Sequence, residues 1–166
     1  MKFELGREQL RIIRSIFAEA EEDNKFIFIK GGWNIDLSYG SQTRKHKDID
    51  FHYDLKDRKF WENFFEEKGF KEEKDGWSSI FTNSDGIVVD FEGVSVSGEI
   101  LTWNHGGSSK SQDVFEDKDY SGLRFKGMKL NVEKYLKLKS AKEGKQLREK
   151  DKHDLALMEE VDKIKS

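Results

Sequence analysis

The feature that most constrains this chain is a short run in which acidic and apolar residues alternate. Asp48, Ile49, Asp50 and Phe51 follow one another directly. Successive side chains of a β-strand point to opposite faces, so a strand here would bury Ile49 and Phe51 and present both aspartates on the other face. The two carboxylates would then lie about 6.6 Å apart along the strand. The pattern predicts a half-buried strand over 48–53 with an acidic face.

A glycine corner precedes this acidic strand. The run Phe26–Lys30 is short and rich in aromatic and β-branched residues, which predicts a strand, and Gly31 and Gly32 end it. Glycines at such a corner let the backbone approach a phosphate closely, because no Cβ blocks the approach and a positive φ costs them little. A plain strand-ending turn also explains two glycines. The aspartates that follow favour phosphate contact.

A third carboxylate, Asp90, lies in the otherwise apolar run Ile87–Glu92. A lone charge in such a strand is expensive to bury, so Asp90 needs a metal, an ionic partner or an exposed edge. If this strand lies beside the one that carries Asp48 and Asp50, three carboxylates meet at one end of the sheet. Such a cluster suits Mg²⁺ and can hold two ions about 3.5–4 Å apart for an in-line phosphoryl displacement. The alternatives are an exposed edge strand for Asp48 and Asp50, and a salt bridge for Asp90.

The remaining pattern predicts an α/β (α+β) fold in which helices pack on a mixed β-sheet. The 166 residues suffice for one hydrophobic core, so we expect a single domain over 1–166. Expected elements are helices over 6–24, 33–39 and 57–68, a strand hairpin over 77–82 and 87–92, a loop over 102–111, short strands near 123–130, and a helical C-terminal part from about 132 that is interrupted at Gly144.

Composition narrows the function further. The chain has no cysteine, so thiolate metal sites and a cysteine nucleophile are excluded, and any metal must be bound by oxygen or imidazole. A net charge of −3 gives no overall field that would attract nucleic acid or an anionic membrane, and we expect neither as a partner. No signal peptide or membrane-spanning run is visible, which predicts a soluble, cytoplasmic protein. Charged residues make up 38%, but Phe60, Trp61, Phe64 and Phe65 share one helix face and predict a folded core.

The run GGWNIDLSYGSQTRKHKDID (31–50) closely resembles the lincosamide and aminoglycoside nucleotidyltransferases, or adenylyltransferases, of the DNA polymerase beta-like superfamily. In that family Gly-Gly-Trp, an aspartate, a Thr-Arg-x-His block and Asp-Ile-Asp occur in this order. The similarity continues through Ile87–Glu92, the loop at Gly106 and Gly107, and the run REKDKHDL near Asp154. The resemblance therefore covers most of the chain and implies the polymerase beta-like fold.

The resemblance also implies an activity. It is the Mg²⁺-dependent transfer of AMP from ATP, or of a nucleotide from another nucleoside triphosphate, onto a hydroxyl of a small molecule such as a lincosamide or aminoglycoside. Carried over residue by residue, Asp48 and Asp50 would ligate Mg²⁺, and Gly31 and Gly32 would contact the triphosphate. Asp90 would act as general base and as a further metal ligand. Two rival functions stay open, a nucleotidyltransferase that modifies a protein, as in toxin–antitoxin systems, and an inactive nucleotide-binding module.

Three further residues next to the acidic strand are expected to bind the nucleotide: Arg44, His46 and Lys47. The guanidinium of Arg44 offers a fork of donors to phosphate oxygens, although a structural ion pair explains it equally well. His46 has the alternative of a plain loop residue. The chain shows no second helical domain that would bind the acceptor. A partner subunit in a homodimer is one way to complete the acceptor site.

Other polar and aromatic residues near the motif receive no catalytic role. Trp33 is expected in the core beneath the glycine corner, and Asp36 is expected to orient the loop that follows by hydrogen bonds. Lys150, Asp151 and Asp154 share the last predicted helix, and we interpret them as a solvated charged face.

Overall fold

The computed structural model describes residues 4–144 and 146–165. Its helices are α1 (Glu4–Glu22), α2 (Gly31–Tyr39), α3 (Arg58–Glu67), α4 (Ser111–Val114), α5 (Leu130–Lys142) and α6 (Glu149–Lys165), with a 3-10 turn η1 (Leu55–Asp57). Its strands are β1 (Ile27–Lys30), β2 (Ile49–Asp54), β3 (Lys71–Asp75), β4 (Ser78–Thr82), β5 (Val88–Ser97), β6 (Ile100–Thr102), β7 (Ser108–Lys110), β8 (Phe115–Tyr120) and β9 (Leu123–Met128).

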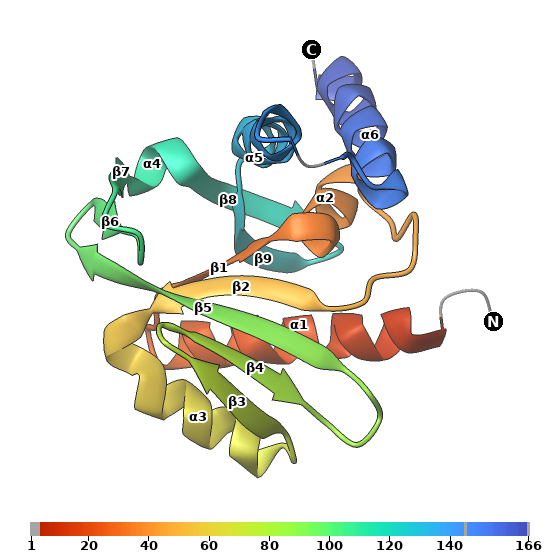
Figure 1. Cartoon of the computed structure of the whole chain (residues 1–166). Coiled ribbons are helices and arrows are strands. Elements are labelled where there is room, and N and C mark those ends of the chain that lie inside the picture. The colour runs from red at the N-terminus through yellow and green to blue at the C-terminus, as the bar shows by residue number, and fades with distance from the viewer. Residues whose placement is uncertain (1–3, 145, 166) are drawn as a thin grey trace.

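The strands form one mixed sheet in the order β3-β4-β5-β2-β1-β9-β8, and β6 and β7 extend it from the end of β5. The pairs β2–β5 and β1–β9 are parallel, whereas β1–β2, β3–β4, β4–β5 and β8–β9 are antiparallel. Helices α1 and α3 cover one face of the sheet, and α2, α5 and α6 lie on the other (Figure 1). The predicted fold class, helices packed on a mixed sheet, is confirmed.

The face toward α1 and α3 carries the aromatic core. Phe51 from β2 and Phe91 from β5 are fully buried there, and their ring centroids lie 5.4 Å apart. Trp61 and Phe65 from α3 pack edge-on against Phe91 at 5.4 and 5.0 Å. The predicted core face of α3 is thus confirmed for its central residues, while Phe60 at its start is only partly buried.

Two of the strands that the sequence analysis did not predict, β3 and β8, are highly charged. The sequences of β3 (KEEKD) and β8 (FEDKDY) are mostly charged, and both strands lie at the ends of the sheet order. Edge strands commonly carry charges because these discourage pairing with another chain. Such strands carry few apolar residues, so a search for alternating apolar positions does not find them. They form because a neighbouring strand is available for pairing.

The structure also corrects the predicted loop over 102–111 and the predicted start of the short helix. The expected loop over 102–111 contains most of a small hairpin, in which β6 pairs with β7 through a turn at Gly106. Its strands are three residues long and too short to show periodicity. The short helix begins at Gly31 rather than Trp33, so the two glycines form its first turn directly after β1.

Among the described residues, each helix is either too short or too polar to traverse a lipid bilayer.

Helix α6 is fastened to the rest of the molecule by buried ion pairs. Asp154 is fully buried and accepts hydrogen bonds from Arg44 Nε (2.9 Å) and Nη2 (2.8 Å), while Lys137 Nζ lies 3.4 Å away. Burial acts to raise the pKa of Asp154, but the Arg44 hydrogen bonds outweigh it and the pKa is lowered. Asp151 is also buried, against Lys137 and Arg148. The predicted solvated face is therefore wrong for Asp151 and Asp154.

We expect Asp154→Ala to lower the free energy of unfolding by about 3 kcal/mol, because it leaves the Arg44 guanidinium largely buried without its bidentate partner. Urea unfolding followed by tryptophan fluorescence measures the change. Asp162→Ala, at an exposed position of the same helix, serves as the matched control and should stay within about 0.5 kcal/mol of wild type. Equal losses in the two variants would contradict this account of α6.

Candidate active site

The three aspartates singled out by the sequence meet on the face of the sheet opposite the aromatic core. Strands β2 and β5 are parallel neighbours, and their register sets Asp50 directly beside Asp90. Asp48 stands just before β2, and one carboxylate oxygen from each residue lies within 4.8 Å of the others. Both strands are interior in the sheet order, so the alternative of an exposed edge strand is wrong.

The cluster carries more negative charge than its burial favours. Burial, and next the Asp48 charge, raise the pKa of Asp50 to about 7. Burial also raises the pKa of Asp90, and the nearby Lys30 ammonium opposes both shifts. Three convergent carboxylates are the hard oxygen donors that Mg²⁺ takes in proteins, so the donor set fits this ion. Bringing such a cation in would displace protons from these groups, since carboxylate ligands must be ionised.

Gly31 forms the corner next to this cluster and must be glycine for two reasons. Its φ is +76°, a left-handed backbone value that residues other than glycine rarely adopt. A Cβ added there would also lie 2.6 Å from Asp50 Oδ2. Because α2 starts at this residue, the helix N-terminus, where backbone N–H groups favour anions, lies beside the carboxylates. The corner therefore places backbone N–H donors beside the Asp50 carboxylate.

We expect Gly31→Ala to weaken Mg²⁺ binding at least tenfold, because the added methyl group must displace the Asp50 carboxylate. Gly40 provides a matched control at the other end of α2, since it also has a positive φ (+110°) but no atom within 4 Å of an added Cβ. Both alanine variants carry the backbone strain, whereas only the first disturbs the ligand. Calorimetric titration with Mg²⁺, alongside thermal unfolding, separates the effects. Unchanged affinity in Gly31→Ala would refute the close approach.

The sequence analysis did not identify Glu133, whose side chain binds the backbone of the glycine corner. Its buried carboxylate on α5 accepts hydrogen bonds from Gly31 N (2.7 Å) and Asn34 Nδ2 (2.8 Å), and Asn34 Nδ2 also donates to the Met128 carbonyl. Burial raises the pKa of Glu133 despite these donors. The bond to Gly31 satisfies an N–H that has no partner within α2. A single glutamate in a helix gives no sequence signal of this role, because its partners lie about 100 residues away.

The loop between α2 and β2 is held by Asp36, as predicted. Its carboxylate accepts hydrogen bonds from Thr43 N (2.9 Å) and Thr43 Oγ1 (2.5 Å), and it pairs with His46 Nε2 at 2.6 Å. Trp33 is buried beneath the corner, as expected, and its ring contacts the His46 ring. The imidazole of His46 is almost completely buried. This burial favours a role in holding the loop over the predicted contact with nucleotide.

Arg44 and Lys47 lie at the mouth of the site. Arg44 forms the structural ion pair with Asp154 described above, and its guanidinium also lies against Gly32, where an added Cβ would collide with Nη2. Both residues line a small pocket of about 90 Å³ next to the carboxylates. The pocket gathers five cationic side chains from three segments of the chain: Arg44, Lys47, Lys137, Arg148 and Lys150. An anionic ligand above the carboxylates would meet these charges.

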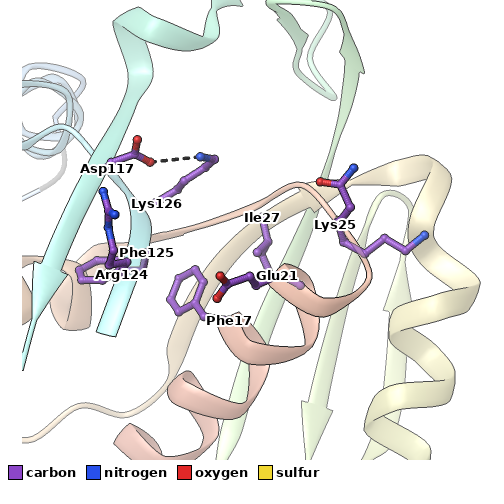
Figure 2. A pocket seen from close by; sticks show the side chains of 10 residues that line it. Phe17, Glu21, Lys25, Ile27, Asp117, Arg124, Phe125 and Lys126 are labelled. Carbon is purple, nitrogen blue, oxygen red and sulfur yellow. Dashed lines mark hydrogen bonds and ion pairs between the residues drawn. The ribbon is translucent and has the colours of Figure 1, made fainter. Parts of the chain in front are cut away.

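A larger pocket of about 480 Å³ adjoins this small one, because Gly31, Asp50, Lys137 and Arg148 line both. A separate pocket of about 370 Å³ lies between the end of α1 and the β8–β9 hairpin (Figure 2). It is lined by Phe17, Ile27 and Phe125, which face away from the carboxylates, and by the Asp117–Lys126 ion pair. The sheet separates this 370 Å³ pocket from the acidic cluster. The candidate active site therefore lies on the face of the sheet that carries α5 and α6.

Comparison with solved structures defines the class of fold. The chain superposes on the lincosamide antibiotic adenylyltransferase LnuA, solved with lincomycin bound, with a TM-score of 0.78 and 20% identity over 93% of this chain and 96% of that one. It superposes on ANT(2")-Ia, in complex with adenylyl-2"-tobramycin, with a TM-score of 0.75 and 22% identity over 93% of each chain. The fold is therefore that of the polymerase beta-like nucleotidyltransferases, as the resemblance predicted.

Sequence comparison gives the family. Residues 12–158 match the model of the aminoglycoside-2''-adenylyltransferase family, and the chain belongs to this family. A 2''-aminoglycoside nucleotidyltransferase from Escherichia coli is 50% identical over 42 residues, which are 25% of this chain and 24% of that protein. An equally similar relative occurs in Klebsiella pneumoniae. These alignments span about a quarter of each relative.

Proposed function

We propose that the protein is a Mg²⁺-dependent nucleotidyltransferase that moves AMP from ATP onto a hydroxyl group of a small molecule, an aminoglycoside or lincosamide antibiotic. The observation that carries the proposal is the cluster of Asp48, Asp50 and Asp90 beside the glycine corner. Family membership supports the antibiotic as acceptor, and the family name favours an aminoglycoside. The complete set of three carboxylates speaks against an inactive binding module, which would need fewer of them.

The residues of the cluster divide the chemistry among them. Asp48 and Asp50 would hold Mg²⁺, which when bound would neutralise charge on the triphosphate oxygens. Asp90 takes the proton of the acceptor hydroxyl as its oxygen forms a bond to the α-phosphorus, and the bond to the β-phosphate breaks to release pyrophosphate. Burial raises the pKa of Asp90, which makes the ionised carboxylate a stronger base. Gly31 and Gly32 let the triphosphate approach, and Lys47, Lys137 and Arg148 balance its charge.

The acceptor approaches along β5 past Asp90, where the next side chain on the same face is Glu92. Lys30 Nζ lies 2.7 Å from the Glu92 carboxylate, and His52 Nε2 lies 3.6 Å from it. Burial and the Lys30 charge hold the pKa of His52 well below its usual value, so its ring is neutral at pH 7. Of these groups, the partly exposed Lys30 ammonium and Glu92 carboxylate offer a donor and an acceptor to a hydroxylated ligand. A homodimer in which the partner subunit completes the acceptor site stays a prediction.

The test is incubation with ATP, Mg²⁺ and a panel of aminoglycosides and lincosamides, read by mass spectrometry as the gain of one AMP and by release of pyrophosphate. We expect Asp90→Asn to lower turnover by about 10²–10⁴-fold, the usual contribution of a general base. Asp48→Asn and Asp50→Asn should abolish transfer, because they remove a metal ligand while the fold is kept.

Asp85→Asn, in the exposed β4–β5 turn, is the control and should retain full activity. Wild-type turnover in Asp48→Asn or Asp50→Asn would overturn the metal assignment. Transfer of label from ATP to proteins of a lysate, with no antibiotic modified, would instead assign the protein-modifying alternative.

A further inference from the structure

We infer that Lys30 sets the charge at the acceptor end of the site, and that it selects hydroxylated acceptors with few ammonium groups over polycationic ones. This inference rests on the proposed function, because it takes Asp90 as the group that receives the acceptor hydroxyl. Lys30 is the last residue of β1, directly before the glycine corner. The sequence analysis gave it no role beyond its place in that strand.

Lys30 stands in one row with two carboxylates of the acidic cluster. The antiparallel register of β1 and β2 sets Lys30 beside Asp50, and the parallel register of β2 and β5 sets Asp50 beside Asp90. Directly opposed residues on neighbouring strands share a face of the sheet. The ammonium group of Lys30 is therefore a fixed cation on the face that carries the three aspartates.

Glu92, rather than an aspartate of the cluster, holds this cation. Lys30 Nζ donates to Glu92 Oε2 at 2.7 Å, and this is the one salt bridge that Lys30 makes among the described residues. Burial acts to lower the pKa of Lys30, but the charges of Glu92, Asp50 and Asp90 outweigh it and the pKa is raised. Lys30 is therefore charged at neutral pH and pairs with Glu92 as an ion.

The pair is open to a ligand that approaches Asp90. The Lys30 side chain is 26% exposed and the Glu92 side chain 39% exposed, and Glu92 follows Asp90 on the same face of β5. An unpaired Glu92 would attract an ammonium group of the acceptor, and the adjacent Lys30 charge cancels this attraction. Lys30 can still donate its other Nζ protons to a hydroxyl oxygen. The pair therefore favours hydroxyl groups over amines.

A purely structural salt bridge makes a different prediction. If the pair only braced the sheet, loss of either partner would weaken the site for every acceptor, whatever its charge. If the pair sets the charge of the site, loss of Lys30 and loss of Glu92 have opposite effects on a polycationic acceptor. The chain also offers a matched control in Lys25, whose side chain is 27% exposed and pairs with Asp57 at 3.2 Å. Lys25 lines the 370 Å³ pocket, which the sheet separates from the acidic cluster.

Calorimetric titration of the full chain with kanamycin, which carries several amines, and with lincomycin, which carries a single basic amine, tests the inference. Saturating Mg²⁺ and the α,β-methylene analogue of ATP keep the site loaded without transfer of AMP. We expect Lys30→Met to tighten kanamycin binding about tenfold, the factor for one unit charge at about 6 Å in a partly buried site, and to change lincomycin binding by about twofold at most. Glu92→Gln should weaken kanamycin binding by a similar factor, because Lys30 then stands unpaired.

The double variant Lys30→Met/Glu92→Gln should return to the wild-type affinity, and Lys25→Met should alter neither antibiotic. The outcomes separate this inference from the proposed function. If Lys30→Met leaves kanamycin binding unchanged, or if both single variants weaken both antibiotics alike, Lys30 is only a structural brace and the inference is overturned while the proposed function stands. If wild type neither binds nor modifies any antibiotic of the panel, the proposed function fails and the inference fails with it.

Discussion

The parallel pairing of β2 with β5 is the constraint on which the rest of the site depends. Its register sets Asp50 beside Asp90 on one face and Phe51 beside Phe91 on the other. Because side chains alternate along a strand, a shift of one residue in either strand would turn its carboxylate into the aromatic core and expose its ring. The burial of Phe51 and Phe91 under α1 and α3 therefore fixes the geometry of the acidic cluster on the opposite face.

That cluster is unfavourable in itself, and the surrounding elements compensate for it. Lys30 on β1 lies close enough to lower the pKa values of Asp50 and Asp90, and the N-terminus of α2 lies beside them. On the outer side, α5 contributes Lys137 and the segment before α6 contributes Arg148, and both side chains are held by Asp151. Carboxylates whose pKa values are raised in a pocket lined by cations are typical of a functional site, because a simple structural ion pair would lower those pKa values. The protein keeps a charge imbalance that a metal and an anionic ligand would relieve together.

Much of this architecture could be predicted because local pattern and global fold agree there. The alternation at Asp48–Phe51, the glycines after β1 and the β4–β5 hairpin all have strong local signals, and the resemblance joined them into one fold. The charged strands β3 and β8 had no such signal, because the pairing of an edge strand depends on its neighbour. Asp154 was misplaced on a solvated face for a related reason, since its partner Arg44 lies 110 residues earlier.

The sequence by itself determined the chemical inventory of the site: three carboxylates on or beside two strands, a glycine corner, and no thiol. Alternation and residue size are local properties, so one strand at a time suffices to read them. Only the tertiary structure decided which charged groups lie buried and which surround the pocket. Glu133 and Asp154 occupy ordinary helical positions, and their environment is set by contacts with segments about 100 residues away, which no local pattern encodes.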